Sequence, residues 1–296
     1  MTARIVEIGS PAALVYRDGH LRIERAGGSV ALVPIEDLGV LVLDQPQVTL
    51  TAPLLTACAE ANVAVVVCDA RHTPTALLSP FEGNTLHLKV LRGQVEAGAP
   101  VKKRLWQTIV RAKICAQAGA LKRICGEDFR LGALAAFVRS GDPENVESRA
   151  ARAYFHRLFG DGFVRDRYGQ GVNQMLNYGY AIVRAAVARA IVGAGLHPAL
   201  AVHHSNQYNP FALADDLVEP LRPLVDVRAH ASCARCAPAD GLSQAARHSL
   251  LEVLTDEVDL GGRRYPIMTA VGLYAATFRD CLLGEERHMI CPAWPE

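Results

Sequence analysis

The hydrophobic pattern of this 296-residue chain changes its period near residue 80, and this change constrains the fold more than any other feature. Before it, short alternating or continuous apolar runs are separated by turn signals such as Asp18-Gly19, a pair typical of two-residue hairpins. One helical stretch, residues 49–61, interrupts these runs. After residue 88, apolar residues recur at helical spacing in nearly every segment. The sequence therefore predicts an α+β fold, with a small N-terminal β domain containing one helix and a larger all-helical C-terminal domain.

A segment rich in Pro, Gly and Asn lies between the two parts, and we interpret its residues 81–88 as a linker. We expect the N-terminal domain over residues 1–80 and the C-terminal domain over residues 89–296. In the first, residues 63–68 form a continuous apolar run that predicts a strand buried on both faces. In the second, helices are expected over residues 101–124 (as one helix or two), 131–140, 143–159, 172–194, 212–221, 242–255 and 266–283.

Composition and hydropathy exclude several classes of protein. Half of the residues are hydrophobic and only 21% are charged, which is inconsistent with a disordered chain. No secretory signal is recognised, and the most apolar stretch, residues 180–196, contains Arg184 and Arg189, so we reject a membrane span. We therefore expect a soluble protein of the cytoplasm.

Eight cysteines without a secretory signal argue against a disulfide framework. Cys233 and Cys236 form a lone CxxC motif, which Cys291, His230 or His248 could complete as a zinc site. Reduced thiols that bind no metal are the favoured interpretation. The segment after Asp226 has little apolar periodicity and is expected to be a mobile loop.

The formal net charge of +1 hides an uneven distribution. Residues 1–85 carry five Lys and Arg against nine Asp and Glu, whereas residues 89–130 carry ten basic and three acidic residues. This asymmetry indicates a basic surface on the second part of the chain, as nucleic-acid-binding proteins have.

One acid lies where an apolar residue is expected. In the helix predicted over residues 143–159, Glu147 lies 3, 7 and 11 residues before Ala150, Tyr154 and Leu158, within the apolar stripe. A carboxylate facing a protein core is costly if it is left unpaired. Two interpretations stay open: a buried ion pair with an Arg of a neighbouring helix, or a metal ligand.

A second group of candidate ligands lies in residues 201–223. Asp216 and Glu219 are three residues apart, which places them on one side of a helix, and Pro220 predicts a bend beside them. His204, twelve residues before Asp216, lies in a loop that is able to fold back over this helix. The alternative is a solvated acidic helix start that is favoured by the helix dipole.

Together, Glu147, His204, Asp216 and Glu219 make an oxygen-rich set with one imidazole. Such a set suits Mg²⁺, and the imidazole shifts the preference towards Mn²⁺. A metal site beside a basic helical surface suggests phosphodiester chemistry.

Four segments carry a resemblance to a known family: ENVESRAARAYF around Glu147, LNYGYAIVRAAV, VHHSNQYNPFALADDLVEPLRP and RRYPIMTAV. Over essentially its whole length the chain resembles the CRISPR-associated adaptation integrase, the nuclease–integrase of spacer acquisition, in its type II version. The resemblance implies metal ligands at Glu147, His204 and Glu219, with Asp216 as a supporting acid.

The activity implied by the resemblance is DNA integration. The 3′-hydroxyl of a short duplex attacks a phosphodiester at the edge of a CRISPR repeat, and the family also cleaves DNA. It works as homodimers, two of which are bridged by a dimer of a small ferredoxin-like adaptation partner. An RNA-guided type II effector nuclease is expected to help select the DNA. Two alternatives stay open: a structure-specific nuclease that acts on branched DNA in repair, and a non-catalytic DNA-binding scaffold.

Several further residues are candidates for contact with DNA. Most are basic, and for each Lys or Arg taken singly a solvated surface charge is the favoured interpretation, whereas some members of the set are expected to bind DNA. The candidates are Lys102, Lys103, Arg104, Arg111, Lys113, Lys122, Arg123, Arg149, Arg152, Asn173, Tyr178 and His203. For Tyr178, core packing is the favoured alternative.

Overall fold

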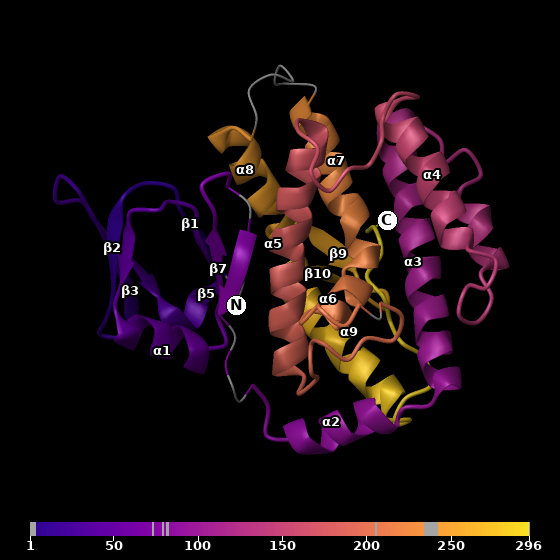
Figure 1. The fold of residues 1–296 in the computed structure, drawn as a ribbon, viewed down its shortest axis with the longest axis horizontal. Helices are drawn as coiled ribbons and strands as arrows, with labels where there is room; N and C mark the ends of the chain where they lie inside the picture. The colour runs from indigo at the N-terminus through magenta and orange to yellow at the C-terminus, as the bar shows by residue number, and fades with distance from the viewer. Residues whose placement is uncertain are drawn as a thin grey trace.

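The computed structural model describes residues 4–72, 74–78, 80, 83–204, 206–233 and 242–295. Strands predominate up to residue 78 and helices from residue 87 onward, which confirms the predicted α+β class (Figure 1). The helical part departs from the prediction in one detail. It contains a short antiparallel hairpin of β9 (Glu257–Asp259) and β10 (Arg264–Pro266), so it is not all-helical.

The N-terminal part contains two four-stranded sheets. One sheet has the order β4-β3-β2-β6 and the other has the order β1-β5-β7-β8, in which β1, β5 and β7 are parallel. The predicted hairpin turn is confirmed, since Asp18 and Gly19 have φ values of 51° and 79° between paired strands. The elements are β1 (Arg4–Ile8), β2 (Ala12–Arg17), β3 (His20–Arg25), β4 (Val30–Pro34), β5 (Leu38–Leu43), β6 (Val48–Leu50), α1 (Ala52–Glu60), β7 (Ala64–Cys68) and β8 (Pro74–Leu78).

The sheet β1-β5-β7-β8 contributes to two hydrophobic cores. Because side chains alternate along a strand, Leu41 of β5 packs with the other sheet and α1, while its neighbours Val40 and Val42 pack with the helices. In β7, Val65 and Val66 divide in the same way. The prediction of a run buried on both faces is confirmed for residues 63–66, whose second face meets the helical part, whereas Val67 is 40% exposed.

A buried group of charges also joins the two parts. Nε of Arg247, in α8 (Gln244–Leu251), lies 2.8 Å from a carboxylate oxygen of Asp44 and 3.3 Å from one of Glu7. Nδ1 of His72 lies 2.9 Å from the other Asp44 oxygen. The helical part is thus held to the sheet by ion pairs as well as by apolar packing.

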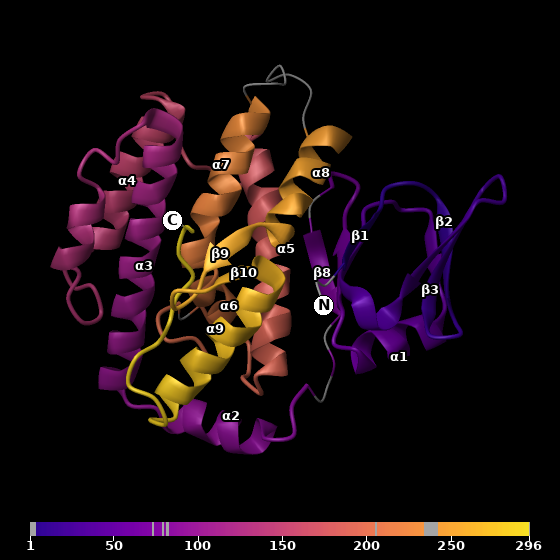
Figure 2. The same ribbon diagram turned by 180° about the vertical axis from the view of Figure 1, so that it is seen from behind.

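The remaining helices stand beside this sheet. Helix α5 lies against β7 and β8, and α3 and α4 form the edge farthest from the sheet (Figures 1 and 2). None of the helices in the described ranges has the length and apolar content required to cross a bilayer. The helices are α2 (His87–Glu96), α3 (Ala99–Cys125), α4 (Val146–Phe159), α5 (Val172–Gly193), α6 (Ala212–Leu217), α7 (Arg222–Cys233), α8 and α9 (Ile267–Leu282).

Several helix predictions need correction. The helix expected over residues 49–61 is shorter, Ala52–Glu60, because Val48–Leu50 form β6, and α2 was not predicted. Residues 131–140 form only a 3-10 helix, Gly132–Phe137. The helix expected from residue 143 begins at Val146, with Asn145 at the N-cap position. The Asp142 carboxylate accepts hydrogen bonds from the NH groups of Val146 and Glu147 at 2.9 and 3.0 Å. The segment after Asp226, expected to be a loop, is helical up to Cys233, because its small residues Ala229 and Ser232 are buried against other helices.

The segment after α9 runs back across the helices and ends on α3. Asp259 and Ala293 exchange two main-chain hydrogen bonds, of 3.0 and 2.9 Å. Beyond them, Nε1 of Trp294 donates a hydrogen bond of 2.6 Å to the carbonyl oxygen of Ala116. A methyl group at Gly119 would lie 2.2 Å from the Trp294 ring, so only glycine leaves room for the indole there.

Candidate active site

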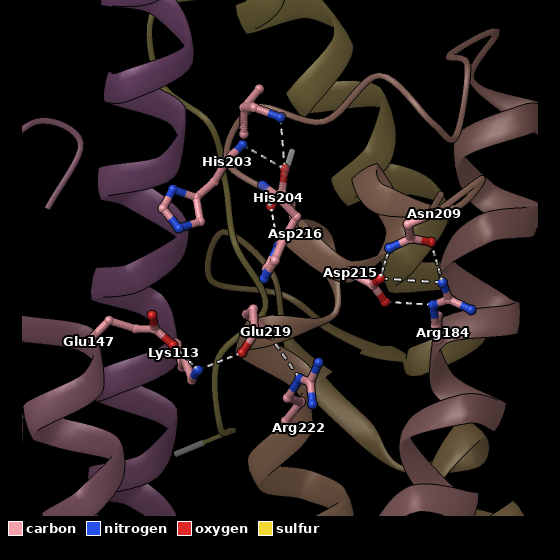
Figure 3. Close-up of polar contacts among 11 residues, drawn as sticks. Lys113, Glu147, Arg184, His203, His204, Asn209, Asp215, Asp216, Glu219 and Arg222 are labelled. Atoms are coloured by element: carbon pink, nitrogen blue, oxygen red, sulfur yellow. Dashed lines mark hydrogen bonds and ion pairs between the residues drawn. The ribbon is translucent and has the colours of Figure 1, made fainter. Parts of the chain in front are cut away.

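Four segments that are distant in the chain bring polar side chains together between α3, α4 and the start of α7. Helix α3 contributes Lys113, α4 contributes Glu147, the loop before α6 contributes His204, and the turn between α6 and α7 contributes Glu219 (Figure 3). The predicted residues Glu147 and Glu219 point towards one another with Lys113 between them.

The turn that carries Glu219 owes its shape to proline. Helix α6 ends at Leu217, a short 3-10 turn covers Glu219–Leu221, and α7 starts at Arg222. Pro220 has no NH to continue the α-helical hydrogen bonding, which explains the break. The predicted bend is confirmed, and it directs Glu219 inward, where the residue is 5% exposed.

Asp216 organises the loop that carries the histidines. Its carboxylate is buried and accepts hydrogen bonds from the NH groups of Val202, His203 and His204 at 2.7, 3.1 and 3.1 Å. Nδ1 of His204 lies 2.7 Å from the same carboxylate. This hydrogen bond, outweighing partial burial, raises the pKa of His204. With Nδ1–H directed at Asp216, Nε2 carries the lone pair, as in many metal-binding histidines.

The neighbouring acid, Asp215, has a different set of partners. Its carboxylate lies 2.5 Å from Nε of Arg184 on α5 and 2.5 Å from the side-chain amide of Asn209. The two adjacent aspartates therefore fix the two sides of the loop that precedes α6 (Figure 3). The interpretation of Asp215 and Asp216 as a merely solvated helix start does not hold.

Glu147 and Glu219 share one ammonium group. Nζ of Lys113 contacts Oε1 of Glu147 and lies 2.6 Å from Oε2 of Glu219, while Nε of Arg222 lies 3.0 Å from Oε1 of Glu219. Burial alone would raise the pKa of Glu219, but Arg222 and Lys113 lower it to about 2. The ion-pair interpretation of Glu147 is therefore right in kind, with a lysine in place of the expected arginine.

The side chains of this site are of the kinds that a divalent ion requires. Two carboxylates and one imidazole suit Mg²⁺ or Mn²⁺, but Oε2 of Glu219 already lies 2.6 Å from Nζ of Lys113. The nearby His204 also contributes to lowering the pKa of Glu219. However, in the described ranges no three His, Cys, Asp or Glu side chains surround one point closely enough to hold an ion. The ligand assignment stays a prediction.

Two of the residues predicted to contact DNA are buried. Lys113 is 8% exposed and its charge is directed at the carboxylates, so it does not belong to a basic surface. Tyr178 is 1% exposed and packs in the core, as the alternative interpretation held. Both corrections have one cause: each side chain points from its helix into the helical core rather than towards solvent.

Two other candidates have partners within the chain. The ring of His203 stacks on Trp106 with centroids 3.9 Å apart and planes 2° apart. The side-chain oxygen of Asn173 accepts hydrogen bonds from Arg165 and from the NH of Asp166, at 3.1 and 2.9 Å. These contacts fix the segments before α6 and before α5.

The other basic candidates remain on the surface. Lys102 is half-buried, and the rest are exposed, although the Arg123 guanidinium lies 4.6 Å above the Trp294 ring and Arg111 donates to the Val138 carbonyl. The exposed set on α3 and α4 is Lys103, Arg104, Arg111, Lys122, Arg123, Arg149 and Arg152.

The possible zinc site gains no support. Sγ of Cys233 lies 3.6 Å from Sδ of Met175, and Cys236 lies outside the described residues. In the part of the chain that the structure describes, Cys233 joins no group of three potential ligands.

Sequence reasoning missed a buried acid next to this site. The Asp226 carboxylate accepts hydrogen bonds from the hydroxyl groups of Tyr180 and of Tyr154, the latter at 2.9 Å. Burial raises the pKa of Asp226 to about 6. The signal was the one that singled out Glu147, a carboxylate within an apolar run, here LVDV.

Comparisons with known proteins were consistent with one another. Residues 7–235 match the family model described as CRISPR associated protein Cas1. The chain is 36% identical over 282 residues to a CRISPR-associated endonuclease Cas1 of Neisseria meningitidis serogroup C (strain 8013), covering 94% of this chain and 92% of that protein.

Solved structures share the fold. A casposase bound to integration product aligns with a TM-score of 0.79 and 17% identity, over 98% of this chain and 92% of that chain. A Cas6-RT-Cas1--Cas2 complex aligns with a TM-score of 0.74 and 17% identity, over 100% of this chain and 36% of that chain.

Proposed function

Because this chain belongs to the Cas1 family of CRISPR-associated proteins, we propose that it is a metal-dependent DNA integrase and endonuclease. It inserts short duplex DNA, as new spacers, into a CRISPR repeat array. The family and the named relative support the integrase or endonuclease role. The observation that carries the metal dependence is the convergence of Glu147 and Glu219 on one positive charge beside His204.

In this proposal, Glu147, His204 and Glu219 bind one Mg²⁺ or Mn²⁺, and Asp216 supports them. A bound ion would act as a Lewis acid on the phosphodiester that is attacked. Asp216 holds Nδ1 of His204, which orients the ring and leaves Nε2 as the ligand atom. Arg222 holds Glu219 through its other carboxylate oxygen.

The chain's remaining polar residues position the DNA. The exposed basic side chains of α3 and α4 bind phosphates, with Arg149 and Arg152 nearest to Glu147 in the sequence. A 3′-hydroxyl of the captured duplex attacks the target phosphodiester, and the target strand leaves with a new 3′-hydroxyl. The reaction is an exchange of one phosphodiester bond for another and needs no external energy source.

The proposed partners follow from the family and from the named neighbours. A structural neighbour is part of a complex with Cas2, and we propose that this chain acts as a homodimer with a small ferredoxin-like partner of that kind. The N-terminal part, residues 1–80, would serve dimerisation and partner contact, and residues 89–296 catalysis. A type II RNA-guided effector nuclease is a further proposed partner, and the site of action is the prokaryotic cytoplasm.

The test is a joining assay with a short duplex and a supercoiled plasmid that carries a repeat array. We expect Glu147→Gln and His204→Asn each to lower joining about a thousandfold, since each removes transition-state stabilisation of several kcal/mol. Duplex binding in EDTA, measured by fluorescence anisotropy, should stay within about twofold of wild type, since no metal contributes to it there. The exposed Glu127→Gln serves as the matched control.

The same assay separates the alternatives. Cutting of branched DNA without joining would favour the structure-specific nuclease. Joining that survives both substitutions, or chelation of divalent ions, would exclude the proposed mechanism. Wild-type protein that binds the duplex but neither joins nor cuts DNA would favour the non-catalytic scaffold.

A further inference from the structure

Lys113 occupies an unusual position for a lysine. It lies in the middle of α3 with its side chain 10% exposed, and its neighbours Ile109 and Ile114 are fully buried. Its ammonium group reaches two carboxylates that come from different elements, Glu147 on α4 and Glu219 on the turn before α7. A buried pairing of this kind is much more strongly coupled than an exposed salt bridge.

The two carboxylates depend on Lys113 to different extents. In the described ranges, the only side chain that forms an ion pair with Glu147 is Lys113. Glu219 also pairs with Arg222, but through Oε1, whereas Lys113 meets Oε2. Without the ammonium group, Glu147 and Glu219 would face each other as unshielded like charges.

The local charges cancel. Glu147 and Glu219 carry two negative charges, and Lys113 and Arg222 carry two positive charges. A divalent ion entering this group unchanged would leave these four side chains with an excess of two positive charges. The buried Asp216 carboxylate offsets only one of them, so the arrangement is unfavourable in a buried setting. Either the ammonium group must move away, or an anion such as a DNA phosphate must join.

We propose that Lys113 is a tethered counter-ion that holds Glu147 and Glu219 together before the metal binds and competes with the metal for them. Arrival of DNA phosphates offsets the excess charge, so metal affinity and DNA affinity are coupled through Lys113 and each strengthens the other. This inference rests on the proposed metal site. The long flexible stem of lysine, which ends in a compact point charge, is suited to this exchange.

The test is calorimetric titration with Mn²⁺, with and without a short duplex whose 3′ ends are dideoxy-terminated. For wild type, we expect the duplex to tighten Mn²⁺ binding. For Lys113→Met, which keeps the length of the side chain and removes its charge, Mn²⁺ binding without DNA should tighten about tenfold or more. The gain on adding the duplex should be smaller than in wild type. Lys89→Met, which changes an exposed lysine of α2 outside the proposed phosphate-binding set, should behave as wild type.

A second variant keeps the charge, so the inference does not depend on the folding of Lys113→Met. In Lys113→Arg, the guanidinium group pairs with carboxylates in a fixed bidentate geometry and should weaken Mn²⁺ binding below the wild-type affinity. Thermal unfolding in EDTA should show a lower Tm for Lys113→Met than for wild type, and Mn²⁺ should reduce the difference.

The outcomes separate this inference from the proposed function. If wild type binds no Mn²⁺ even with the duplex, the metal site itself is wrong. If wild type binds Mn²⁺ and both Lys113 variants show the same affinity and the same gain with DNA, the site stands and the role of Lys113 is overturned.

Discussion

Asp216 holds His204 twice through one carboxylate oxygen, since both the main-chain NH of His204, at 3.1 Å, and its Nδ1, at 2.7 Å, meet Oδ1. The other oxygen receives the NH groups of Val202 and His203. One buried side chain thus sets the path of the loop and the orientation of the ring. Removing the carboxylate should therefore affect folding as well as the site.

We expect Asp216→Asn to lower the free energy of unfolding by about 2 kcal/mol, because the new amide group would direct a donor at donors in a buried position. His204→Asn should cost less, since the three main-chain hydrogen bonds to Asp216 remain. Urea unfolding of both variants and wild type measures the difference. Equal losses in the two variants would show that Asp216 acts only through the histidine ring.

Titration of Asp226 should make the free energy of unfolding depend on pH. Burial raises the pKa of Asp226 from 3.8 in the unfolded chain to about 6 in the native state. The native protein therefore holds this proton more tightly, and the contribution of Asp226 to stability falls as the pH rises from about 4 to about 6. Above that range both states have lost the proton, and the contribution stays constant.

The variant Asp226→Asn cannot titrate and should lack this loss. Between about pH 5 and pH 7.5 the unfolding free energy of wild type should fall by about 1.4 kcal/mol relative to the variant. Urea unfolding at the two pH values gives the comparison. The two tyrosine hydroxyl groups can still bond to the amide. If the difference in unfolding free energy between wild type and Asp226→Asn does not change with pH, the pKa of Asp226 in the native state is not raised.

The contact between Gly119 and Trp294 should appear as strong coupling between two substitutions. Alanine in place of a helical glycine normally adds about 1 kcal/mol of stability, but here the methyl group would overlap the indole, at a cost of about 1–3 kcal/mol. We expect Gly119→Ala to be destabilising in wild type and stabilising in a Trp294→Ala background. Thermal unfolding of the four proteins completes the cycle. An equal effect in both backgrounds would show that the indole does not occupy this position in solution.

Much of the fold follows from the order of hydrophobic patterns. The alternating and continuous apolar runs predicted most strands of the N-terminal part, although not β6, and β9 and β10 were missed. The long apolar helix and the bend at Pro220 were also predicted. Helix α7 was not predicted, and its second half was expected to be a loop, because Ala229 and Ser232 are buried without being strongly hydrophobic. A hydropathy pattern identifies large apolar side chains, whereas closely packed helices also bury small residues of low hydropathy.

The candidate site was only partly predictable. A carboxylate on an apolar stripe is conspicuous, so Glu147 could be singled out from the sequence. Lys113 could not, because a lysine among other basic residues on one long helix resembles a surface charge, and only the packing of α4 and the α6–α7 turn against α3 buries it. Which residue neutralises an acid is decided by tertiary contacts between distant segments.

The valines of β5 and β7 that pack with the helical part determine how this protein could be combined with its relatives in a chimera. Val40, Val42 and Val66 belong to the sheet but lie in the core that the helices form, so most residues of that core are encoded in the C-terminal part. A chimera joined within residues 79–86 would pack the valine face of this sheet against the helices of a relative, whose side chains fit a different sheet. Such chimeras would require compensating substitutions in the helices that pack against the sheet. The isolated N-terminal part would expose these valines to solvent and would aggregate through this apolar surface.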